Sequence, residues 1–346
     1  MHPIFITVGV LFWIYVGHYL IITLLAKNKK IEYKNNEKKP EITIIIPINK
    51  KTNFLNKKIR NTLKLKYPTN KLQILVVDSK NGHNKLLCSN FPAISYIQRT
   101  KDNLNNALNC ALKKAKGEIV VKTDHDCFLE SDVLEKLIKY FEIKNIGIVA
   151  GTEEVIQYPM KIYRDIVNSI RIKESLIDST WAGGSFYAFR KNIVKKIPET
   201  KLISDDTFLS FEAVKKGYRA ISVADIKVKE DISKDLIVTF KKFRRYFTQG
   251  IYTTLYQKNT LSKNPFFALV TIKNFLHLTL GPLLMYLILI YAITHLNINL
   301  LITLTGLTSL LCIFNKNIRN LAILFVMFLT IWPIAILYAI FKIEKW

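Results

Sequence analysis

The chain has 346 residues, of which 50% are hydrophobic, and its 51 Lys and Arg against 26 Asp and Glu give a formal net charge of +25. This composition excludes an ordinary soluble enzyme, which is less apolar, and an all-membrane protein, which carries less charge. On a chain with long apolar segments, positive charge favours anionic lipid headgroups or phosphorylated substrates over nucleic acid, so we expect no nucleic-acid partner.

The first apolar segment covers residues 4–26 and contains no Lys, Arg, Asp or Glu. It is long enough to cross a bilayer as a helix, and basic residues follow it at positions 27–30. It lacks the basic start and the small-residue cleavage site of a secretory signal, so we interpret it as an anchor. The basic residues at its far end predict a multi-pass protein of the cell membrane whose middle part is cytoplasmic.

The polar middle of the chain alternates strands with helices. Apolar β-branched runs predict strands at residues 41–47, 72–78, 94–98, 119–123 and 145–151, and helical patterns lie at residues 53–65, at 103–116 before Gly117, and from Ser131 as the N-cap. This alternation predicts an α/β fold with a mostly parallel sheet and helices on both faces, which binds ligands at the carboxyl ends of its strands.

Three acidic residues fall at these carboxyl ends: Asp78 after the second strand, and Asp124 and Asp126 after the fourth. Residues i and i+2 of an extended segment share a face, so Asp124 and Asp126 can enter one pocket while His125 points away. Carboxylate oxygens suit Mg²⁺ or Mn²⁺ held together with a diphosphate. Taken alone, an Asp-x-Asp is more often a solvated turn. The third carboxylate at the same rim favours the metal site.

Two later motifs also have two interpretations each. Gly183 and Gly184 precede an aromatic run, and they either let a backbone approach a sugar closely or form a bulge or turn. Asp205 and Asp206 precede a helix predicted from Thr207 onward. They either cap that helix or supply a general base that takes the proton of an acceptor hydroxyl.

Residues 240–250 mix basic and aromatic side chains directly before the last apolar part of the chain. An amphipathic interfacial helix would place these bases among lipid headgroups, while Arg244 and Arg245 could also clamp a diphosphate leaving group, and the two interpretations are compatible. Apolar blocks that predict three more membrane helices follow at residues 266–295, 300–314 and 321–341. The first block is either one tilted helix or an interfacial segment followed by a helix.

From residue 41 to residue 250, this order of motifs resembles the membrane-integrated family 2 glycosyltransferases, the group of hyaluronan, chitin and cellulose synthases. The match is best over residues 107–126, and Asp205-Asp206 stands where the family has Glu-Asp. The resemblance implies a GT-A type nucleotide-sugar-binding domain inserted between transmembrane helices. The expected parts are an N-terminal helix at 1–26, a basic linker at 27–40, the catalytic domain at 41–240, an interfacial segment at 241–264 and a membrane region at 265–346.

The resemblance also implies a role for each site residue. The donor would be a UDP-sugar, with its uracil held by Asp78 and its ribose near Asp124, and with Pro47, Arg244 and Arg245 on the donor side. Asp126 would hold Mg²⁺ or Mn²⁺. Asp206, beside Asp205, would be the base, and Gly183 and Gly184 would face the acceptor. The expected reaction inverts the anomeric carbon and passes the sugar to a lipid or a growing glycan, with membrane lipids as further partners.

Two departures from the family concern the donor pocket and processivity. Pro47 is followed by Ile48-Asn49-Lys50-Lys51, where the family has an aromatic residue, Asn and Glu. The Gln-x-x-Arg-Trp of processive synthases is absent: Phe243, Tyr246 and Phe247 take its place or, after a shift of one residue, Lys242, Arg245 and Tyr246. Two alternatives therefore stay open, a single-sugar transferase acting on a polyprenyl phosphate or other lipid and a non-catalytic sugar-nucleotide-binding membrane protein.

Overall fold

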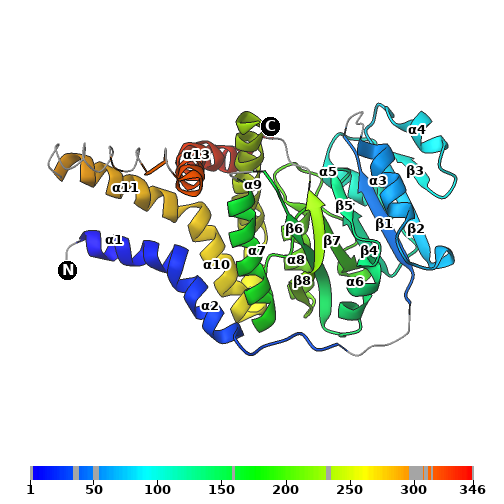
Figure 1. Cartoon of the computed structure of the whole chain (residues 1–346), viewed down its shortest axis with the longest axis horizontal. Coiled ribbons are helices and arrows are strands. Elements are labelled where there is room, and N and C mark those ends of the chain that lie inside the picture. The colour runs from blue at the N-terminus through cyan, green and yellow to red at the C-terminus, as the bar shows by residue number, and fades with distance from the viewer. Residues whose placement is uncertain are drawn as a thin grey trace.

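The computed structural model describes residues 3–33, 39–49, 54–157, 160–230, 235–295, 307, 311–312 and 315–344. A mixed sheet with helices on both faces makes up one side of the molecule, and helices from both ends of the chain make up the other (Figure 1). Helices α7 (Met160–Ile177) and α9 (Leu236–Tyr256) stand between the two sides.

In the described part of the chain the sheet has eight strands in the order β3-β2-β1-β4-β7-β6-β8-β5. They are β1 (Ile42–Pro47), β2 (Leu72–Asp78), β3 (Ser95–Gln98), β4 (Ile119–Thr123), β5 (Cys127–Leu129), β6 (Ile146–Glu154), β7 (Phe186–Arg190) and β8 (Arg219–Glu230). Strands β3, β2, β1 and β4 are parallel, as is the pair β6–β8, whereas β7 and β5 run antiparallel to their neighbours. The predicted mostly parallel sheet is confirmed.

The apolar strands form because helices cover both of their faces. In β1, Ile44 and Ile46 belong to a core shared with α3 (Phe54–Leu63) and α6 (Val133–Phe141), whereas Ile45 belongs to a core shared with α5 (Leu104–Leu112) and α8 (Asp205–Lys215). Successive side chains of a strand point to opposite faces, so a strand buried on both faces is an unbroken apolar run. The short helix α4 (Lys85–Ser89) lies beside β3 at the sheet edge.

Two helix starts differ from the prediction. Helix α6 begins at Val133 with Asp132 as its N-cap, one residue later than the predicted cap at Ser131. Helix α8 begins at Asp205 with Ser204 as its N-cap, so both acids lie inside the first turn rather than before it. Negative charge in a first turn interacts favourably with the helix dipole, which explains the earlier start of α8.

Both ends of the chain form apolar helices. The chain starts with α1 (Pro3–Phe12), a π-helical turn (Trp13–Gly17) and α2 (His18–Ala26), and a candidate span covers Ile6–Ala26. Near the other end, α10 (Pro265–Leu278) and α11 (Leu280–His295) meet at 40°, and α13 (Lys316–Ile340) follows.

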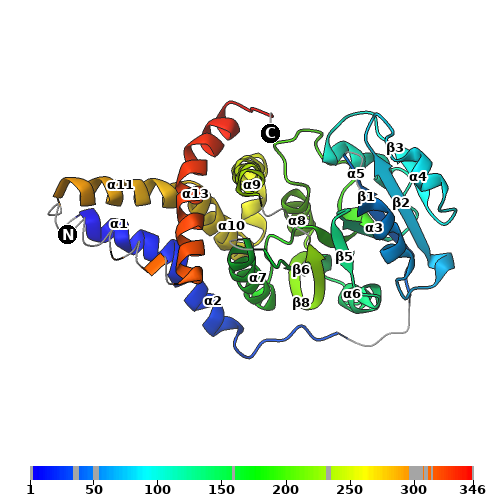
Figure 2. The same cartoon turned by 45° about the horizontal axis from the view of Figure 1, so that its top comes forward.

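The described residues contain two helices long and apolar enough to cross a membrane, or three if α10 and α11 form one span. Figure 2 shows α1 beside α11, with α13 crossing them. The predicted block at residues 266–295 is thus divided into two helices at Thr279, and an interfacial position of the first helix stays a prediction. The helix predicted at residues 300–314 lies outside the described residues apart from 307, 311 and 312.

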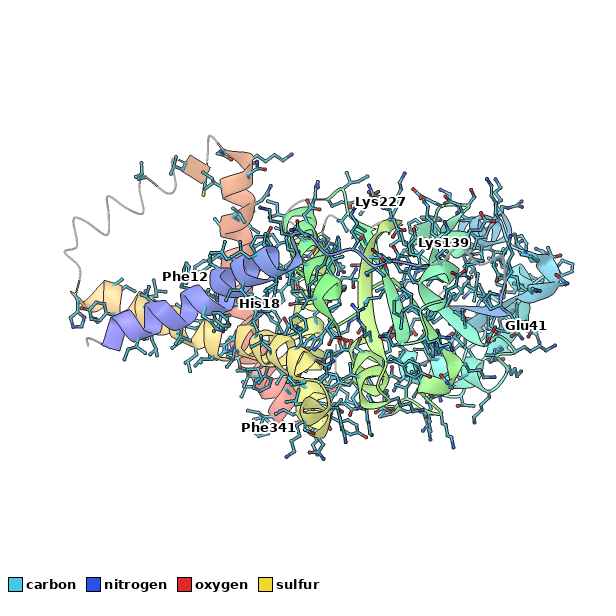
Figure 3. All side chains as sticks on the ribbon, turned by 90° about the horizontal axis from the view of Figure 1, so that it is seen from below. Phe12, His18, Glu41, Lys139, Lys227 and Phe341 are labelled. Atoms are coloured by element: carbon cyan, nitrogen blue, oxygen red, sulfur yellow. The ribbon has the colours of Figure 1, made fainter. Side chains whose placement is uncertain are left out.

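We call the apolar helices from the two chain ends (α1, α2, α10, α11 and α13) the membrane-side helices. Two of them, α10 and α13, share an apolar core with the sheet domain. Phe211 of α8 meets Phe267 of α10 edge to face at 5.0 Å between ring centroids, and Phe247 of α9 meets Phe328 of α13 at 4.9 Å. A buried polar contact adds to this core, because His18 Nε2 lies 2.8 Å from Glu174 Oε1 (His18 is labelled in Figure 3). The two parts of the molecule are therefore packed together rather than tethered.

Gly117 was expected to stop the helix before it, but α5 ends at Leu112 and Gly117 instead lies against β1. A Cβ at Gly117 would lie 2.5 Å from the Thr43 backbone nitrogen and 2.6 Å from the Ile42 carbonyl carbon. Backbone atoms of a central strand cannot move aside cheaply. We therefore expect Gly117→Ala to destabilise the protein by about 1–3 kcal/mol, measured as a lower thermal unfolding midpoint in detergent.

The matched control is Gly9→Ala, because a Cβ at Gly9 of α1 meets nothing within 4 Å. This control should leave the unfolding midpoint unchanged or slightly raised, since Ala is the better helix former. Equal midpoints for Gly117→Ala and the unmodified protein would contradict the close approach of Gly117 to β1.

Candidate active site

One cavity of about 800 Å³ lies between the carboxyl ends of the central strands, helices α7 and α9, and the membrane-side helices. Seven of the predicted site residues line it, namely Pro47, Asp124, Asp126, Gly184, Asp205, Asp206 and Arg245, whereas Asp78, Gly183 and Arg244 do not. Its size is typical of a pocket for a ligand of a few dozen atoms. The structure thus brings together the acidic pairs at 124–126 and 205–206, which are far apart in the sequence.

Asp124, His125 and Asp126 form a turn between β4 and β5. The strand ends at Thr123, and the Cys127 backbone N–H donates to the Asp124 carbonyl oxygen at 3.2 Å. All three residues line the cavity, although His125 was predicted to point away from it. That prediction assumed an extended segment, in which side chains alternate, but a turn releases them from alternation. In the part of the chain that the structure describes, nothing pairs with the Asp126 carboxylate.

Lys122 is the cation at the centre of the acidic residues. Its side chain is 4% exposed, its Nζ lies 2.8 Å from Asp124 Oδ1, and it donates to the Gly184 carbonyl oxygen at 3.4 Å. Burial opposes the charge of this lysine, but the carboxylates of Asp124, Asp205 and Asp206 outweigh burial and raise the pKa of Lys122 above its ordinary value. The ammonium group therefore stays charged and offsets repulsion among the acids.

Asp205 and Asp206 occupy the first turn of α8 but have different surroundings. Asp205 is buried and accepts a hydrogen bond from the Tyr187 hydroxyl at 2.5 Å. Burial raises the pKa of Asp205, and Lys122 counters this increase. Asp206 is half-buried, and its Oδ1 accepts from the Thr207 backbone N–H at 2.6 Å. The more accessible Asp206 is thus better placed to meet a ligand.

The paired glycines make room for two carboxylates. The Gly184 backbone N–H donates to Asp206 Oδ2 at 2.8 Å, and a Cβ at Gly183 would lie 2.4 Å from that same oxygen. Gly184 has a φ of +116°, and a Cβ there would lie 2.1 Å from Glu153 Oε1. Only glycine fits both requirements at position 184. The groups that this backbone approaches are acidic side chains of the protein, and the close approach to a sugar stays a prediction.

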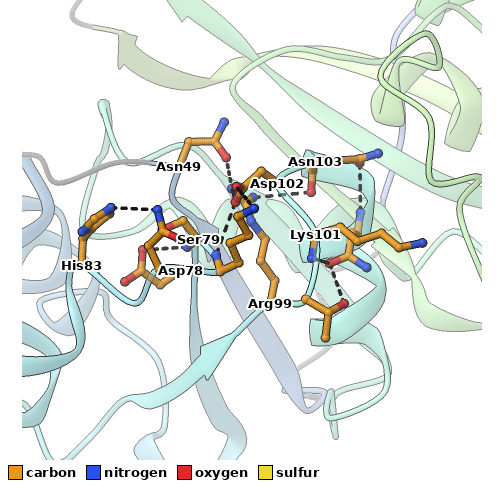
Figure 4. Close-up of polar contacts among 12 residues, drawn as sticks. Asn49, Asp78, Ser79, His83, Arg99, Lys101, Asp102 and Asn103 are labelled. Atoms are coloured by element: carbon orange, nitrogen blue, oxygen red, sulfur yellow. Dashed lines mark hydrogen bonds and ion pairs between the residues drawn. The ribbon is translucent and has the colours of Figure 1, made fainter.

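The Asp78 carboxylate accepts hydrogen bonds from the loop that follows it and from Tyr96 of β3. Its Oδ1 accepts from the Ser79 backbone N–H at 2.7 Å and from Asn84 Nδ2 at 3.0 Å, and its Oδ2 accepts from the Asn84 backbone N–H at 2.7 Å and from the Tyr96 hydroxyl at 3.1 Å. Figure 4 shows that Asn49, Arg99 and Asp102 lie beside this loop. Those three residues line the cavity, and Arg99 donates to the Asn49 side-chain oxygen.

The two predicted arginines of α9 separate. Arg245 lines the cavity, whereas the Arg244 guanidinium lies 4.7 Å from the centre of the Tyr338 ring of α13. Neighbouring residues of a helix point about 100° apart, so only one of the pair can face the pocket. Arg245 is therefore the arginine that is available to a ligand.

A buried ion-pair cluster behind the glycines was not predicted. Arg164 of α7 pairs with Glu153 of β6 at 2.5 Å and lies 3.6 Å from Glu230 of β8, while Lys242 of α9 pairs with Glu230 at 2.6 Å. Burial alone would raise the pKa of Glu153, but Arg164 lowers it below its ordinary value. A charged residue within an otherwise apolar or amphipathic segment is the sequence feature that could have indicated these residues. The same feature marks Lys122 in β4.

Comparison with known proteins shows a family match over half of the chain. A model described as Glycosyl transferase family 2 matches residues 43–216. The O-antigen chain rhamnosyltransferase WbaN of Salmonella anatum is 23% identical over 198 residues, 52% of this chain and 62% of that protein. The poly-beta-1,6-N-acetyl-D-glucosamine synthase of Staphylococcus aureus is 23% identical over 248 residues, 63% of this chain and 56% of that one. The matches thus span about three fifths of those relatives.

A solved structure matches over nearly the whole chain. The mannosyltransferase PcManGT from Pyrobaculum calidifontis, solved in complex with GDP-Man and Mn²⁺, has a TM-score of 0.79 and 22% sequence identity, and the match covers 99% of this chain and 100% of that one. The sheet domain therefore has the GT-A type α/β fold, with terminal apolar helices flanking it.

Removal of the central cation should change how stability depends on pH. In Lys122→Met, Asp205 loses the charge that counters its burial, so its pKa should rise further. When the pKa of a carboxyl group is higher in the folded than in the unfolded state, the folded protein loses stability as the pH rises. This loss begins near the pKa of the unfolded state, about 3.9, and is complete above the pKa of the folded state. The gap in unfolding midpoint between the unmodified protein and Lys122→Met should therefore widen from about pH 4 toward pH 7.

The control for this measurement is Lys161→Met, which removes a lysine from an exposed pair with Asp165 at 2.6 Å on α7. Exposed pairs contribute about 0–1 kcal/mol, so this gap should be small at every pH. A constant gap for Lys122→Met across the pH range would show that Lys122 does not control the charge state of the acidic residues.

Proposed function

Because the chain belongs to glycosyl transferase family 2, we propose that it is a membrane-bound, inverting glycosyltransferase that moves a sugar from a UDP-sugar to a membrane-associated acceptor. The observation that carries this proposal is the single cavity in which two acidic pairs from distant parts of the chain meet, and which continues to the apolar helices. We further propose that the protein is multi-pass with a cytoplasmic catalytic domain, which the apolar helices and the basic residues 27–30 support.

The residues present fit a divalent cation that is shared with a diphosphate. Asp124 and Asp126 supply the oxygen ligands that Mg²⁺ and Mn²⁺ prefer, and the Asp126 carboxylate has no competing partner among the described residues. In that part of the chain no cluster of three or more His, Cys, Asp or Glu could hold a metal alone. Asp126 would therefore hold Mg²⁺ or Mn²⁺ together with the donor, and the ion would neutralise the leaving diphosphate.

The donor would lie along the wall formed by β1, β2 and the turn after β4. We place the ribose near Asp124, with Pro47 and Asn49 on the nucleotide side and Arg245 near the diphosphate. Asp78 would act through its loop, because its four hydrogen bonds hold the segment beside Arg99 and Asn49 in position. A direct contact of Asp78 with uracil would require a donor of the base to displace Asn84 or Tyr96.

The reaction would proceed by in-line displacement with Asp206 as the general base. As the acceptor oxygen forms its bond to the anomeric carbon, the bond from that carbon to the diphosphate oxygen breaks and the hydroxyl proton passes to the Asp206 carboxylate. The Gly184 N–H and the Thr207 N–H orient that carboxylate. Asp205 would hold the first turn of α8 through Tyr187, and the positive charge of Lys122 would offset the repulsion among the acids.

The names of the relatives support a product that is a polysaccharide or a glycolipid. One relative is an O-antigen chain rhamnosyltransferase and another a poly-N-acetylglucosamine synthase. The missing Gln-x-x-Arg-Trp favours addition of a single sugar or short products over processive synthesis. A transferase acting on a polyprenyl phosphate or other lipid is the first alternative, and a non-catalytic sugar-nucleotide-binding protein is the second.

The decisive assay is nucleotide release by the purified protein in detergent, with Mg²⁺ or Mn²⁺ and a panel of UDP- and GDP-sugars, followed by sizing of the product. Release with one sugar would identify the donor, and the product size would separate single addition from polymer synthesis. Nucleotide binding without release, even when membrane lipid extract is added as acceptor, would favour the non-catalytic alternative.

Asp206→Asn should reduce turnover about 100-fold or more, because a positioned general base contributes about 10² to 10⁴. Donor affinity should be nearly unchanged, since Asn keeps the size of the side chain and an oxygen for the Gly184 N–H. The measurement is the turnover rate together with nucleotide-sugar affinity. The control is Asp132→Asn at the exposed start of α6, which should leave both unchanged. Near-normal turnover of Asp206→Asn would remove Asp206 from its role.

Asp126→Asn should weaken donor binding only when the metal is present. The amide lacks the charge that attracts a divalent cation, so nucleotide-sugar affinity measured with Mn²⁺ should fall toward the value measured with chelator. The unmodified protein should show a clear difference between these two conditions. Equal donor affinity with and without metal in the unmodified protein would contradict the assignment of Asp126 as a metal ligand.

A further inference from the structure

The cavity extends beyond the carboxylates into the space between α7 and the membrane-side helices. Its walls there include Tyr15 of the turn after α1, Lys273 and His277 of α10, and Leu324 of α13. Helix α7 lies between the sheet and these helices (Figure 1). A ligand that occupies this end would therefore reach the site from the membrane rather than from the nucleotide-binding edge of the sheet.

This end of the cavity contains more cations than neighbouring carboxylates can pair. Apart from Arg245, which we assign to the donor diphosphate, four basic side chains from α7, α9 and α10 line the cavity: Arg164, Arg171, Lys242 and Lys273. Glu153 and Glu230 are engaged by Arg164 at 2.5 Å and by Lys242 at 2.6 Å. Within the described ranges, the Arg171 guanidinium makes no ion pair. A guanidinium in a partly dehydrated wall is stabilised by an anion, so an anionic ligand fits here.

Lys273 is only weakly neutralised although it is buried. It is 8% exposed, and its Nζ lies 3.8 Å from Glu174 Oε1 and donates to the Asn274 side-chain oxygen at 2.9 Å. Glu174 is shared, because it also binds the His18 ring at 2.8 Å and the Thr180 hydroxyl at 2.5 Å. An ammonium group has three donors, and one long ion pair with one hydrogen bond leaves capacity for a ligand oxygen.

Apolar side chains and one unpaired hydroxyl line the cavity together with these two cations. Val167 and Ile170 of α7, Leu278 of α10 and Leu324 of α13 line the same end. The Tyr15 hydroxyl is buried there without a hydrogen-bond partner in the described part of the protein. A ligand with an anionic head and a hydrocarbon tail satisfies all three features, whereas a free water-soluble anion would leave the apolar walls uncovered.

We propose that Arg171 and Lys273 bind the phosphate group of a membrane lipid, and that this lipid phosphate is the anchor of the acceptor. The proposal rests on the proposed transferase function and specifies the acceptor of the same site. Arg171 supplies a planar pair of donors for phosphate oxygens, Lys273 supplies a second charge, and the Tyr15 hydroxyl supplies a further donor. The hydrocarbon chain would lie along Val167, Ile170 and Leu324 toward the bilayer.

This subsite is separate from the one proposed for the donor diphosphate. The donor side uses the turn at Asp124 and Asp126 and the nearby Arg245, whereas Arg171 and Lys273 project from α7 and α10. One end of the cavity thus suits a nucleotide and the other a lipid. The Asp206 carboxylate lines the same cavity and would meet the acceptor hydroxyl, which a sugar carried on the lipid phosphate would supply.

The test measures binding of geranylgeranyl phosphate to the full chain in detergent, with geranylgeraniol, phosphatidic acid and inorganic phosphate as separate probes. The lipid phosphate should bind at least tenfold more tightly than the uncharged alcohol. Arg171→Gln should weaken that binding about tenfold to 100-fold, since a hydrogen bond to a charged group contributes about that factor. Arg171→Lys should recover part of the affinity because it restores the charge. Lys273→Gln should act in the same direction.

The matched control is Lys173→Gln, two residues along α7. Lys173 does not line the cavity and instead donates to the Ser169 and Tyr19 hydroxyls at 2.9 and 3.1 Å. The Lys173→Gln variant should leave the affinity for geranylgeranyl phosphate unchanged. An equal loss in both variants would overturn the proposal by showing general attraction to basic residues. Tight binding of inorganic phosphate alone would overturn the lipid assignment, and tighter binding of phosphatidic acid than of geranylgeranyl phosphate would assign the site to bulk lipid instead of an acceptor.

Donor measurements separate failure of this proposal from failure of the proposed function. Nucleotide-sugar affinity and the unfolding midpoint of Arg171→Gln should match those of the unmodified protein. If the unmodified protein binds a nucleotide sugar but its affinity for geranylgeranyl phosphate does not respond to Arg171→Gln, the lipid subsite is wrong and the transferase proposal stands. If no nucleotide sugar binds, the transferase proposal itself fails.

Discussion

The ammonium group of Lys122 is the interaction on which the arrangement of the cavity depends. The four carboxylates of the two acidic pairs line one pocket, and like charges in one pocket repel unless a cation or a proton intervenes. Lys122 comes from the central strand β4, contacts Asp124 directly and lies close enough to Asp205 and Asp206 to influence both. It connects the two acidic pairs electrostatically, so the turn after β4 and the start of α8 are tied to the same charge.

The backbone at Gly183 and Gly184 extends this arrangement toward the membrane side. Gly184 lies between Asp206 and Glu153, and Glu153 is paired with Arg164 of α7. One row of contacts therefore runs from the proposed base through the glycine turn to a helix that packs against α2. The buried ion pairs of this row are costly to break singly, because the remaining charge would have no partner. They position α7 relative to the sheet.

Much of the fold could be predicted because β1, β2 and β4 are mostly apolar runs, and because β2 ends in Asp78 and β4 is followed by Asp124. The place of Asp124 and Asp126 at the cavity followed from the rule that parallel strands bind ligands at their carboxyl ends. That Asp205 and Asp206 belong to the same site was implied only by the family resemblance. Three features could not be predicted from local pattern. The place of His125 at the cavity depends on a turn, the hydrogen bonds of Asp78 depend on Asn84 and Tyr96 in a neighbouring loop, and the partners of α7 come from distant segments. Local pattern carries no information about such long-range pairings.

The apolar core that α8 and α9 share with α10 and α13 has a consequence for how the protein can be divided. Phe211, Phe243 and Phe247 are buried against residues of the C-terminal helices. Separated from those helices, the catalytic domain would expose a hydrophobic face of large aromatic rings to water. Fragments and chimeras that end near residue 264 should therefore tend to aggregate. The sheet domain and the C-terminal helices therefore belong to one cooperative unit, which can be transplanted only as a whole.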